Sequence, residues 1–203
     1  GALELTEHFN NLTPIFKLNN LLTLSEWIDA VKSFSDYGDI RALNHLLKSE
    51  QNLRDKINQF SYNLALNGAK NIRKSALELV NAIEEINYDN LELVPLKFVK
   101  DELVKFPYEI SQIEEDWQLF IYLAERNWKN SQFALSILEA HQAILARVGQ
   151  LMGVNAFSQE QNESGAVAAA ARRIKKINGL INAIRQYRNL TAHSDLGFNI
   201  NIE

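Results

Sequence analysis

The chain of 203 residues contains no cysteine, and this absence excludes several kinds of site. Without a thiol there is no disulfide, no cysteine nucleophile and no cysteine-ligated zinc. The sequence also lacks an apolar run of about 18 residues, and its first residues do not follow the charged and then apolar order of a signal peptide. We therefore expect a cytoplasmic protein that crosses no membrane.

Proline and glycine are scarce as well, with three and eight residues. Apolar residues make up 46% of the chain and charged residues 23%, which is typical of globular proteins that bury a core. The sequence contains no Walker A loop, no HExxH and no GxGxxG, and its four histidines lack metal-ligand spacing. We therefore expect no metal site and no cofactor.

Acidic residues are missing from residues 164–194, although the chain has 25 of them and a net charge of −4. The same stretch contains six basic residues, which are Arg172, Arg173, Lys175, Lys176, Arg185 and Arg188. Uneven charge of this kind suits a surface that binds a polyanion. A solvated basic helix face is the alternative, and charge alone does not separate the two.

Helical periodicity dominates from Asn20 onward, with apolar residues recurring at spacings of three and four. The predicted helices span residues 20–37, 39–47, 52–66, 69–86, 96–106, 111–126, 131–152 and 166–189. We expect Pro107 to end the fifth of them, Ser111 to cap the sixth and residues 153–165 to form a surface loop. The predicted fold class is an all-α helical bundle.

The two ends of the chain show short alternating patterns instead. Residues 1–19 predict a loose β-hairpin, and Phe198, Ile200 and Ile202 alternate with polar residues as in a short strand. A lone hairpin is marginally stable, so it needs this strand or a larger sheet as its partner. The sequence therefore predicts a hairpin at residues 1–19 and a helical domain at 20–203.

The last predicted helix contains an isoleucine seam, formed by Ile174, Ile177, Ile181 and Ile184. This spacing is typical of a helix that packs along another helix, either in the same chain or in a second copy. The next position of the seam is Arg188. Since burial of an unpaired guanidinium is costly, we expect Arg188 to lie at a bundle end or in a crevice between helices.

The segment Arg-Asn-Leu-Thr-Ala-His at residues 188–193 supplies the candidate catalytic residues Arg188, Asn189 and His193. Metal-free RNA cleavage needs a group that moves protons near pH 7 and a fixed positive charge on the phosphate, and histidine and arginine supply them. Asn189 and His193 share a helix face, whereas Arg188 and His193 are about 140° apart on an ideal helix. The helix must therefore end or distort between them, or a second subunit must complete the site. The candidate RNA-binding residues are Arg172, Arg173, Lys175, Lys176 and Arg185.

RNLTAH resembles the R-x4-6-H signature of HEPN-domain ribonucleases, in which the residue after the arginine is polar, as Asn189 is. GALE followed by TPIFKLNNLLTLSEWIDAVKSFSDYGD resembles a junction segment of type III accessory CRISPR-associated proteins. There, a strand pair ending a CARF sensor domain leads into a helix with a tryptophan, here Trp27, and a Gly-Asp turn. The resemblance covers about residues 1–40 and 130–195.

This resemblance implies a HEPN-like bundle with its motif core at residues 111–195, which cuts single-stranded RNA as a homodimer in antiviral defence. In that family the CARF domain binds a cyclic oligoadenylate and activates the nuclease. The resemblance makes residues 1–19 the last hairpin of a sensor that is otherwise absent from the chain.

Two other functions remain open at this point. A non-catalytic helical scaffold for dimerisation or RNA binding would also use the isoleucine seam, and HEPN domains also serve as toxins of toxin-antitoxin pairs. Trp128 and Tyr187 can stack on RNA bases, but core packing is the expected use of both. The acidic residues 114–116 are expected to form a solvated first helical turn.

Overall fold

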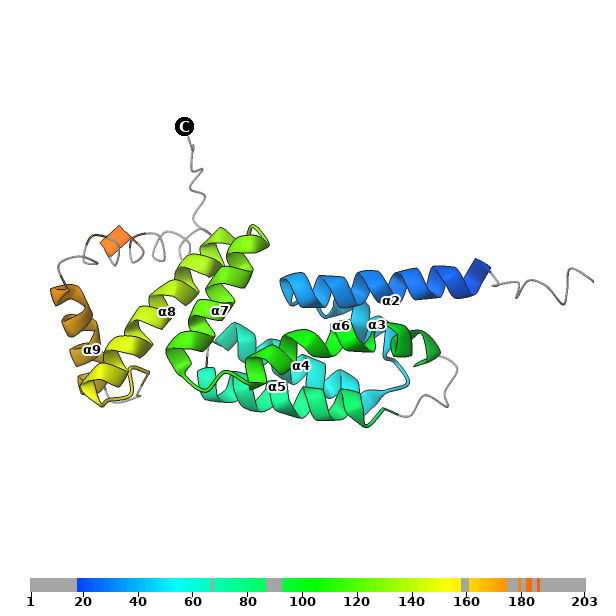
Figure 1. Cartoon of the computed structure of the whole chain (residues 1–203), viewed down its shortest axis with the longest axis horizontal. Coiled ribbons are helices and arrows are strands. Elements are labelled where there is room, and N and C mark those ends of the chain that lie inside the picture. The colour runs from blue at the N-terminus through cyan, green and yellow to red at the C-terminus, as the bar shows by residue number, and fades with distance from the viewer. Residues whose placement is uncertain are drawn as a thin grey trace, which may run out of the picture. The chain divides into compact units, whose positions relative to one another are not determined.

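The computed structural model describes residues 18–66, 68–86, 93–157 and 161–174, together with four single positions further along the chain. In this part of the chain the regular structure is helical, and no β-strand occurs (Figure 1). The helices are α2 (Leu18–Tyr37), α3 (Arg41–Leu46), α4 (Gln51–Leu66), α5 (Ala69–Glu84), α6 (Val94–Ser111), α7 (Asp116–Lys129), α8 (Phe133–Met152) and α9 (Gln161–Arg173). The all-α prediction is confirmed for these residues.

The start of α2 corrects the prediction for the N-terminal end of the chain. The helix begins at Leu18, inside the predicted hairpin, so Asn20 lies within α2 and does not cap it. The predicted hairpin up to residue 17 and the predicted strand at 198–202 lie outside the described residues. The end of α2 agrees with the prediction, because Gly38 adopts a left-handed φ of 71°, which glycine tolerates best.

The chain divides into two compact units. The first comprises Gly1–Tyr62 and Leu77–Pro107, and the second comprises Asn63–Ala76 and Tyr108–Glu203. The division falls within α4, α5 and α6, so each of these helices contributes residues to both units. Among the described helices, none combines the length and the apolar character that a bilayer crossing requires.

Three phenylalanine rings from α2, α4 and α6 form the centre of the first unit. Phe34, Phe60 and Phe106 are buried, and their ring centroids lie 5.5 to 6.1 Å apart in edge-to-face arrangements. Such arrangements are the favoured geometry of aromatic pairs. Trp27 is also buried on α2, as its spacing predicts, whereas Ile28 is 48% exposed although the sequence places it on the apolar face.

Pro107 does not end α6, contrary to the prediction. The helix continues through it to Ser111. Proline removes one backbone donor and crowds the preceding turn, but its fixed φ is close to the helical value. Burial of Phe106 and Ile110 on either side of Pro107 holds the two halves of α6 in place. Tertiary packing thus outweighs the local cost of the proline.

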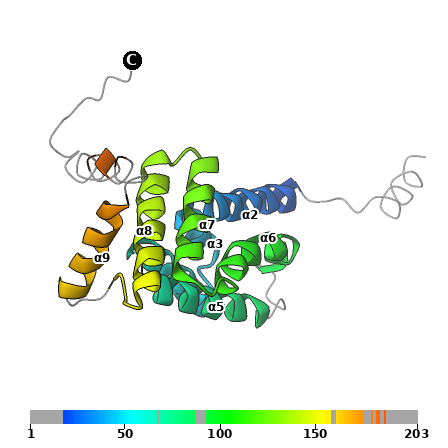
Figure 2. The same ribbon diagram turned by 60° about the vertical axis from the view of Figure 1, so that its left-hand side comes forward.

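In the second unit, α8 contacts α7 along one side and α9 along another (Figures 1 and 2). The helices alternate in direction, so the C-terminal ends of α7 and α9 point the same way (Figures 1 and 2). Val148 of α8, Ala156 of the following turn, and Val167 and Ala171 of α9 form the apolar cluster that holds α9 against α8. Gly153, with a φ of 70°, ends α8 where the sequence predicts.

Three predicted boundaries in this unit are wrong. Ser111 is the last residue of α6, and α7 begins at Asp116 without the predicted side-chain cap. The predicted loop at 153–165 is helical from Gln161, because burial of Val167 supplies packing that a polar sequence does not reveal. The predicted helix 166–189 is interrupted, since α9 ends at Arg173 in a tight turn, with the amide of Ile174 donating to Ala171 at 3.3 Å.

Candidate functional site

The first two predicted RNA-binding residues, Arg172 and Arg173, are the last residues of α9 and are both exposed. Their position follows from the anchoring of α9, because Val167 and Ala171 are almost fully buried. Consecutive helix residues are about 100° apart, so the two residues after Ala171 are turned away from the face that packs on α8. The structure therefore leaves both guanidinium groups accessible to a ligand.

The remaining predicted site residues lie outside the described residues. They are Lys175, Lys176, Arg185, Arg188, Asn189 and His193. The convergence of Arg188, Asn189 and His193 on one phosphate thus stays a prediction. Ile174, the first position of the predicted isoleucine seam, is not helical and is 43% exposed.

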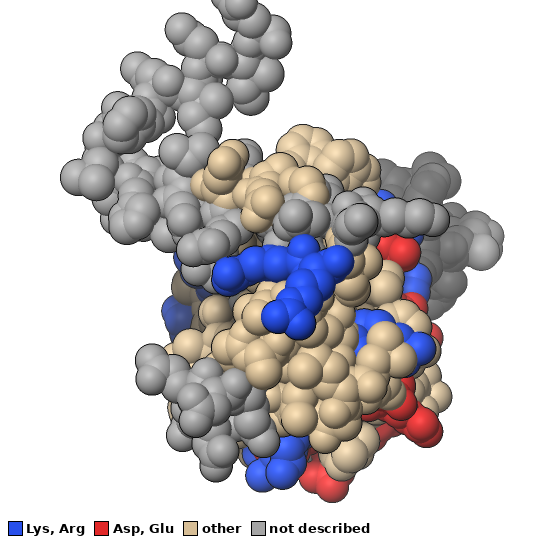
Figure 3. Space-filling model, turned by 90° about the vertical axis from the view of Figure 1, so that its left-hand side faces the viewer, with Lys and Arg blue, Asp and Glu red and all other residues tan. Residues whose placement is uncertain are grey.

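Charge is unevenly distributed on the side of the molecule that Figure 3 presents. Lysine and arginine side chains stand near the middle of the described surface, among uncharged residues, and aspartate and glutamate side chains appear along its right and lower edges (Figure 3). A surface of this kind attracts a polyanion, while acidic residues elsewhere keep the net charge of the chain negative.

The predicted apolar face of α8 is only partly buried, and a second side of the helix is buried as well. The spacing of Phe133, Ile137, Ile144, Leu145 and Val148 predicts one apolar face. Val148 is buried there, and Ile144 and Leu145 pack against the cluster that holds α9, whereas Phe133 is 47% exposed. The second side consists of small and polar side chains, which are Ser136, Glu139, Ala143 and Ala146. Small side chains let two helices approach closely, which explains how α7 packs along this face of α8.

Glu139 is a titratable group that the sequence analysis missed. Its side chain is only 5% exposed, and burial raises the pKa of its carboxyl from the usual 4.5 to about 7. A carboxyl that titrates near neutral pH can act as a general acid or base, although packed carboxyls without a catalytic role also show raised values. The spacing of three and four residues in Ser136, Glu139 and Ala143 was the available signal, because it sets a glutamate on a continuous helix face.

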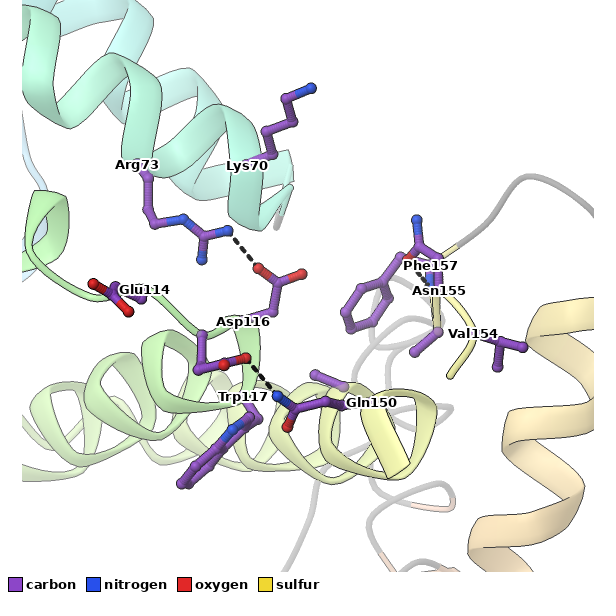
Figure 4. A pocket seen from close by; sticks show the side chains of 12 residues that line it. Lys70, Arg73, Glu114, Asp116, Trp117, Gln150, Val154, Asn155 and Phe157 are labelled. Carbon is purple, nitrogen blue, oxygen red and sulfur yellow. Dashed lines mark hydrogen bonds and ion pairs between the residues drawn. The ribbon is translucent and has the colours of Figure 1, made fainter. Parts of the chain in front are cut away.

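A cavity of about 430 Å³ opens in the second unit between the starts of α5 and α7, the end of α8 and the turn that follows it (Figure 4). Arg73 points toward Asp116, with Nη2 and Oδ1 2.5 Å apart (Figure 4). The amide of Gln150 donates to Glu115 at 2.7 Å (Figure 4). The acidic turn at 114–116 is thus partly engaged in contacts with other helices, and is not merely a solvated helix start.

This cavity is poorly suited to a phosphate group. Its lining includes two cations, Lys70 and Arg73, and three carboxylates, Glu114, Glu115 and Asp116. A phosphate entering it would meet net negative charge, and the Arg73 guanidinium already pairs with a carboxylate. Neither Arg172 nor Arg173, the two predicted RNA-binding residues that the structure describes, lines the cavity. These two arginines therefore lie apart from it.

Trp128 is not a core residue, contrary to the prediction. It is 59% exposed in the last turn of α7, and its indole meets the ring of Phe133 edge-on with centroids 4.8 Å apart. Asn127 takes the buried position in this turn, and Trp128 lies about 100° from it around the helix. Tyr187, the other aromatic residue considered for stacking, lies outside the described residues.

Within the described ranges, no three histidine or acidic side chains gather as a metal-binding group.

Comparison with known proteins relates the chain to CRISPR-associated proteins. Residues 23–115 match the family model described as the second domain of CRISPR-associated protein MJ1674. Over 204 residues, which cover 97% of the chain, the sequence is 22% identical to CRISPR-associated protein MJ1674 of Methanocaldococcus jannaschii. The chain spans about a third of that relative, 32% of its length. No solved structure matches the chain.

The family match and the motif fall in different parts of the chain. Residues 23–115 contain most of α2, which the sequence resemblance also covers, and all of α3 to α6, which lie outside the residues that the resemblance covers. The motif at 188–193 lies beyond the family match but within the nearly full-length similarity to the relative. Along almost its whole length, the chain is thus similar to about one third of a CRISPR-associated protein.

Proposed function

We propose that the chain is the nuclease part of a CRISPR-associated protein and cuts single-stranded RNA without a metal ion. The observation that carries the proposal is the RNLTAH segment at 188–193, which follows a stretch of basic residues without acidic ones. The similarity to a CRISPR-associated protein and the exposure of Arg172 and Arg173 support it.

In the proposed reaction the ribose 2′-hydroxyl attacks the neighbouring phosphorus and the 5′-oxygen leaves. His193 takes the proton from the 2′-hydroxyl or gives one to the leaving oxygen, because imidazole exchanges protons near pH 7. The planar guanidinium of Arg188 neutralises the phosphate oxygens as negative charge builds up on them. Asn189 orients the histidine or binds a phosphate oxygen. The products are a 2′,3′-cyclic phosphate and a 5′-hydroxyl.

Two further parts of the proposal come from the resemblance to CARF-HEPN proteins. The nuclease acts in the cytoplasm as a homodimer, in which the two copies of the motif face a common groove. A cyclic oligoadenylate activates it through a CARF sensor domain. On an ideal helix Arg188 and His193 would be about 140° apart, which fits a site that a second copy completes.

The test is cleavage of a single-stranded RNA by chelator-treated protein. Replacement of His193 by alanine is expected to slow cleavage by about 100- to 10,000-fold, and Arg188→Ala by about 100- to 1,000-fold. His45→Ala serves as the matched control, because His45 is exposed on α3 and is far from the motif in sequence. It is expected to leave the rate unchanged. If the His193 and Arg188 variants cut as fast as the parent, the proposed function is wrong.

A non-catalytic RNA-binding scaffold is the second candidate. The exposed pair Arg172 and Arg173 favours it, since these residues can hold RNA whether or not cleavage follows. Salt-sensitive RNA binding by the parent, with no cleavage under any activating condition, would select this function over the nuclease.

A further inference from the structure

The turn between α7 and α8 exposes an aromatic pair that no part of the proposed reaction uses. Trp128 is 59% exposed and Phe133 is 47% exposed. Their rings meet at 66° with centroids 4.8 Å apart, so the phenylalanine supports the indole by an edge contact. An indole supported in this way stays accessible to a second planar group.

A mainly apolar hollow of about 270 Å³ lies beside the indole. Its lining comes from the last turns of α7, with Ala124, Glu125, Trp128 and Lys129, and from Ser136 of α8. Its volume is at the lower limit of small-molecule sites, which suits one planar ring system better than a larger ligand.

The cation beside the indole suits a base that is carried on a phosphate chain. Arg126 and Lys129 are the basic residues of the last turn of α7, and Lys129 is exposed. Such residues also complement the helix dipole. Lys129 nevertheless stands next to the exposed indole, and an aromatic ring beside a cation is the usual arrangement of single-strand binding surfaces. Glu125 is the one carboxylate that lines the hollow, and it opposes a phosphate there.

A protein partner fits this turn less well. A stable protein interface buries about 800 Å² on each side and has a continuous apolar centre. Here the exposed apolar side chains are Trp128, Phe133 and Leu135, and the exposed charged groups of Glu125 and Lys129 stand beside the indole at the hollow.

We propose that Trp128 stacks on a base of the single-stranded RNA substrate, while Arg172 and Arg173 contact its phosphates. This inference rests on RNA being the ligand, as in the proposed function. The C-terminal ends of α7 and α9, which carry these residues, point the same way on two sides of α8 (Figures 1 and 2). Both sets of residues thus belong to the second unit and lie at the ends of two helices that contact α8.

The test measures binding of a fluorescent 2′-O-methyl RNA, which has bases but cannot be cut through the 2′-oxygen. Trp128→Ala is expected to weaken binding about 10-fold, and Trp128→Phe to restore most of it, because stacking needs an aromatic face. Tyr108→Ala removes another exposed aromatic residue of the same unit and is expected to bind as the parent does. For an abasic oligomer, Trp128→Ala and the parent should bind equally.

Tryptophan fluorescence supplies a second measurement. RNA is expected to quench the emission of the parent more than that of Trp128→Phe, because the two remaining tryptophans are not placed to stack at this turn. Trp27 is buried, and Trp117 lines the other cavity with Arg147 over its ring. Equal binding of the 2′-O-methyl RNA by Trp128→Ala and the parent would overturn the inference. A change of the oligomeric mass of Trp128→Ala in light scattering, with unaltered RNA binding, would overturn it in favour of a protein interface. Because this oligomer is never cut, the result does not depend on whether Arg188 and His193 catalyse cleavage.

Discussion

The phenyl rings of Phe34 and Phe106 meet edge to face, with centroids 6.0 Å apart, and so join α2 to α6 in the first unit. Phe60 of α4 completes the group, at 6.1 Å from the first ring and 5.5 Å from the second. The family match at residues 23–115 contains all three positions. This aromatic group is therefore the expected determinant of the stability of the first unit.

Replacement of Phe106 by alanine is expected to lower the free energy of unfolding by about 3 to 5 kcal/mol, because the cavity it leaves is surrounded by packed side chains. Phe98→Ala on the same helix is the control. Phe98 is 73% exposed, so its loss should change stability by less than about 0.5 kcal/mol. Urea unfolding followed by circular dichroism measures both. Equal effects of the two substitutions would show that the Phe106 ring is not in the core.

Two glycines in the second unit are expected to respond oppositely to alanine. A Cβ on Gly149 would lie 2.8 Å from the Cβ of Ala156 and 2.9 Å from the carbonyl oxygen of Val154. Gly149→Ala should therefore destabilise by about 1 to 3 kcal/mol, despite the better helix propensity of alanine. A Cβ on Gly165 of α9 meets nothing within 4 Å, so Gly165→Ala should stabilise by up to about 1 kcal/mol. Thermal unfolding of both variants measures the difference, and a stabilising Gly149→Ala would contradict the packing of this turn on α8.

Glu139 is expected to make stability depend on pH. Burial raises the pKa of its carboxyl from 4.5 to about 7, so the folded chain keeps a proton that the unfolded chain releases at lower pH. The buried carboxyl therefore destabilises the folded chain little below pH 4.5. This destabilisation grows to about 3 kcal/mol as pH rises through 7. Relative to the parent, Glu139→Gln should gain stability between pH 5 and pH 8.5, because glutamine carries no charge at either pH.

Glu125→Gln is the control for this measurement, since Glu125 is exposed on α7. Its difference in unfolding free energy from the parent should stay constant over the same pH range. A Glu139→Gln difference that also stays constant would mean that the carboxyl is ionised in the folded chain and that burial does not govern its pKa.

The helical class and most helix ends could be predicted, because they depend on local spacing and on residues such as Gly38 and Gly153. Continuation of α6 through Pro107 could not be predicted from the sequence, since it depends on the burial of Ile110 in the folded chain. The same holds for α8, where apolar spacing located the side on which Ile144, Leu145 and Val148 pack in the cluster that holds α9, but not the second buried side with Ser136 and Glu139. Periodicity locates an apolar stripe, and it does not reveal a buried side that is formed by small and polar residues.

The candidate site, too, could be predicted from the sequence only in part. Exposure of Arg172 and Arg173 agrees with the charge pattern of the sequence, which singles out the basic end of the chain. The exposure of Trp128 could not be predicted, because a tryptophan next to a buried helix face is equally compatible with core packing and with exposure. The catalytic assignments of Arg188, Asn189 and His193 stay predictions from the motif.

In the proposed function, cleavage uses the ribose 2′-hydroxyl and no metal ion. The most direct measurement uses an oligonucleotide with a single ribonucleotide in a deoxyribose strand, incubated with the protein in excess EDTA, and identifies the ends of the products. We predict one cut, directly after the ribonucleotide, that leaves a 2′,3′-cyclic phosphate and a 5′-hydroxyl and is lost in His193→Ala. Cutting of an all-deoxyribose strand, or cutting only when Mg²⁺ is restored, would contradict it.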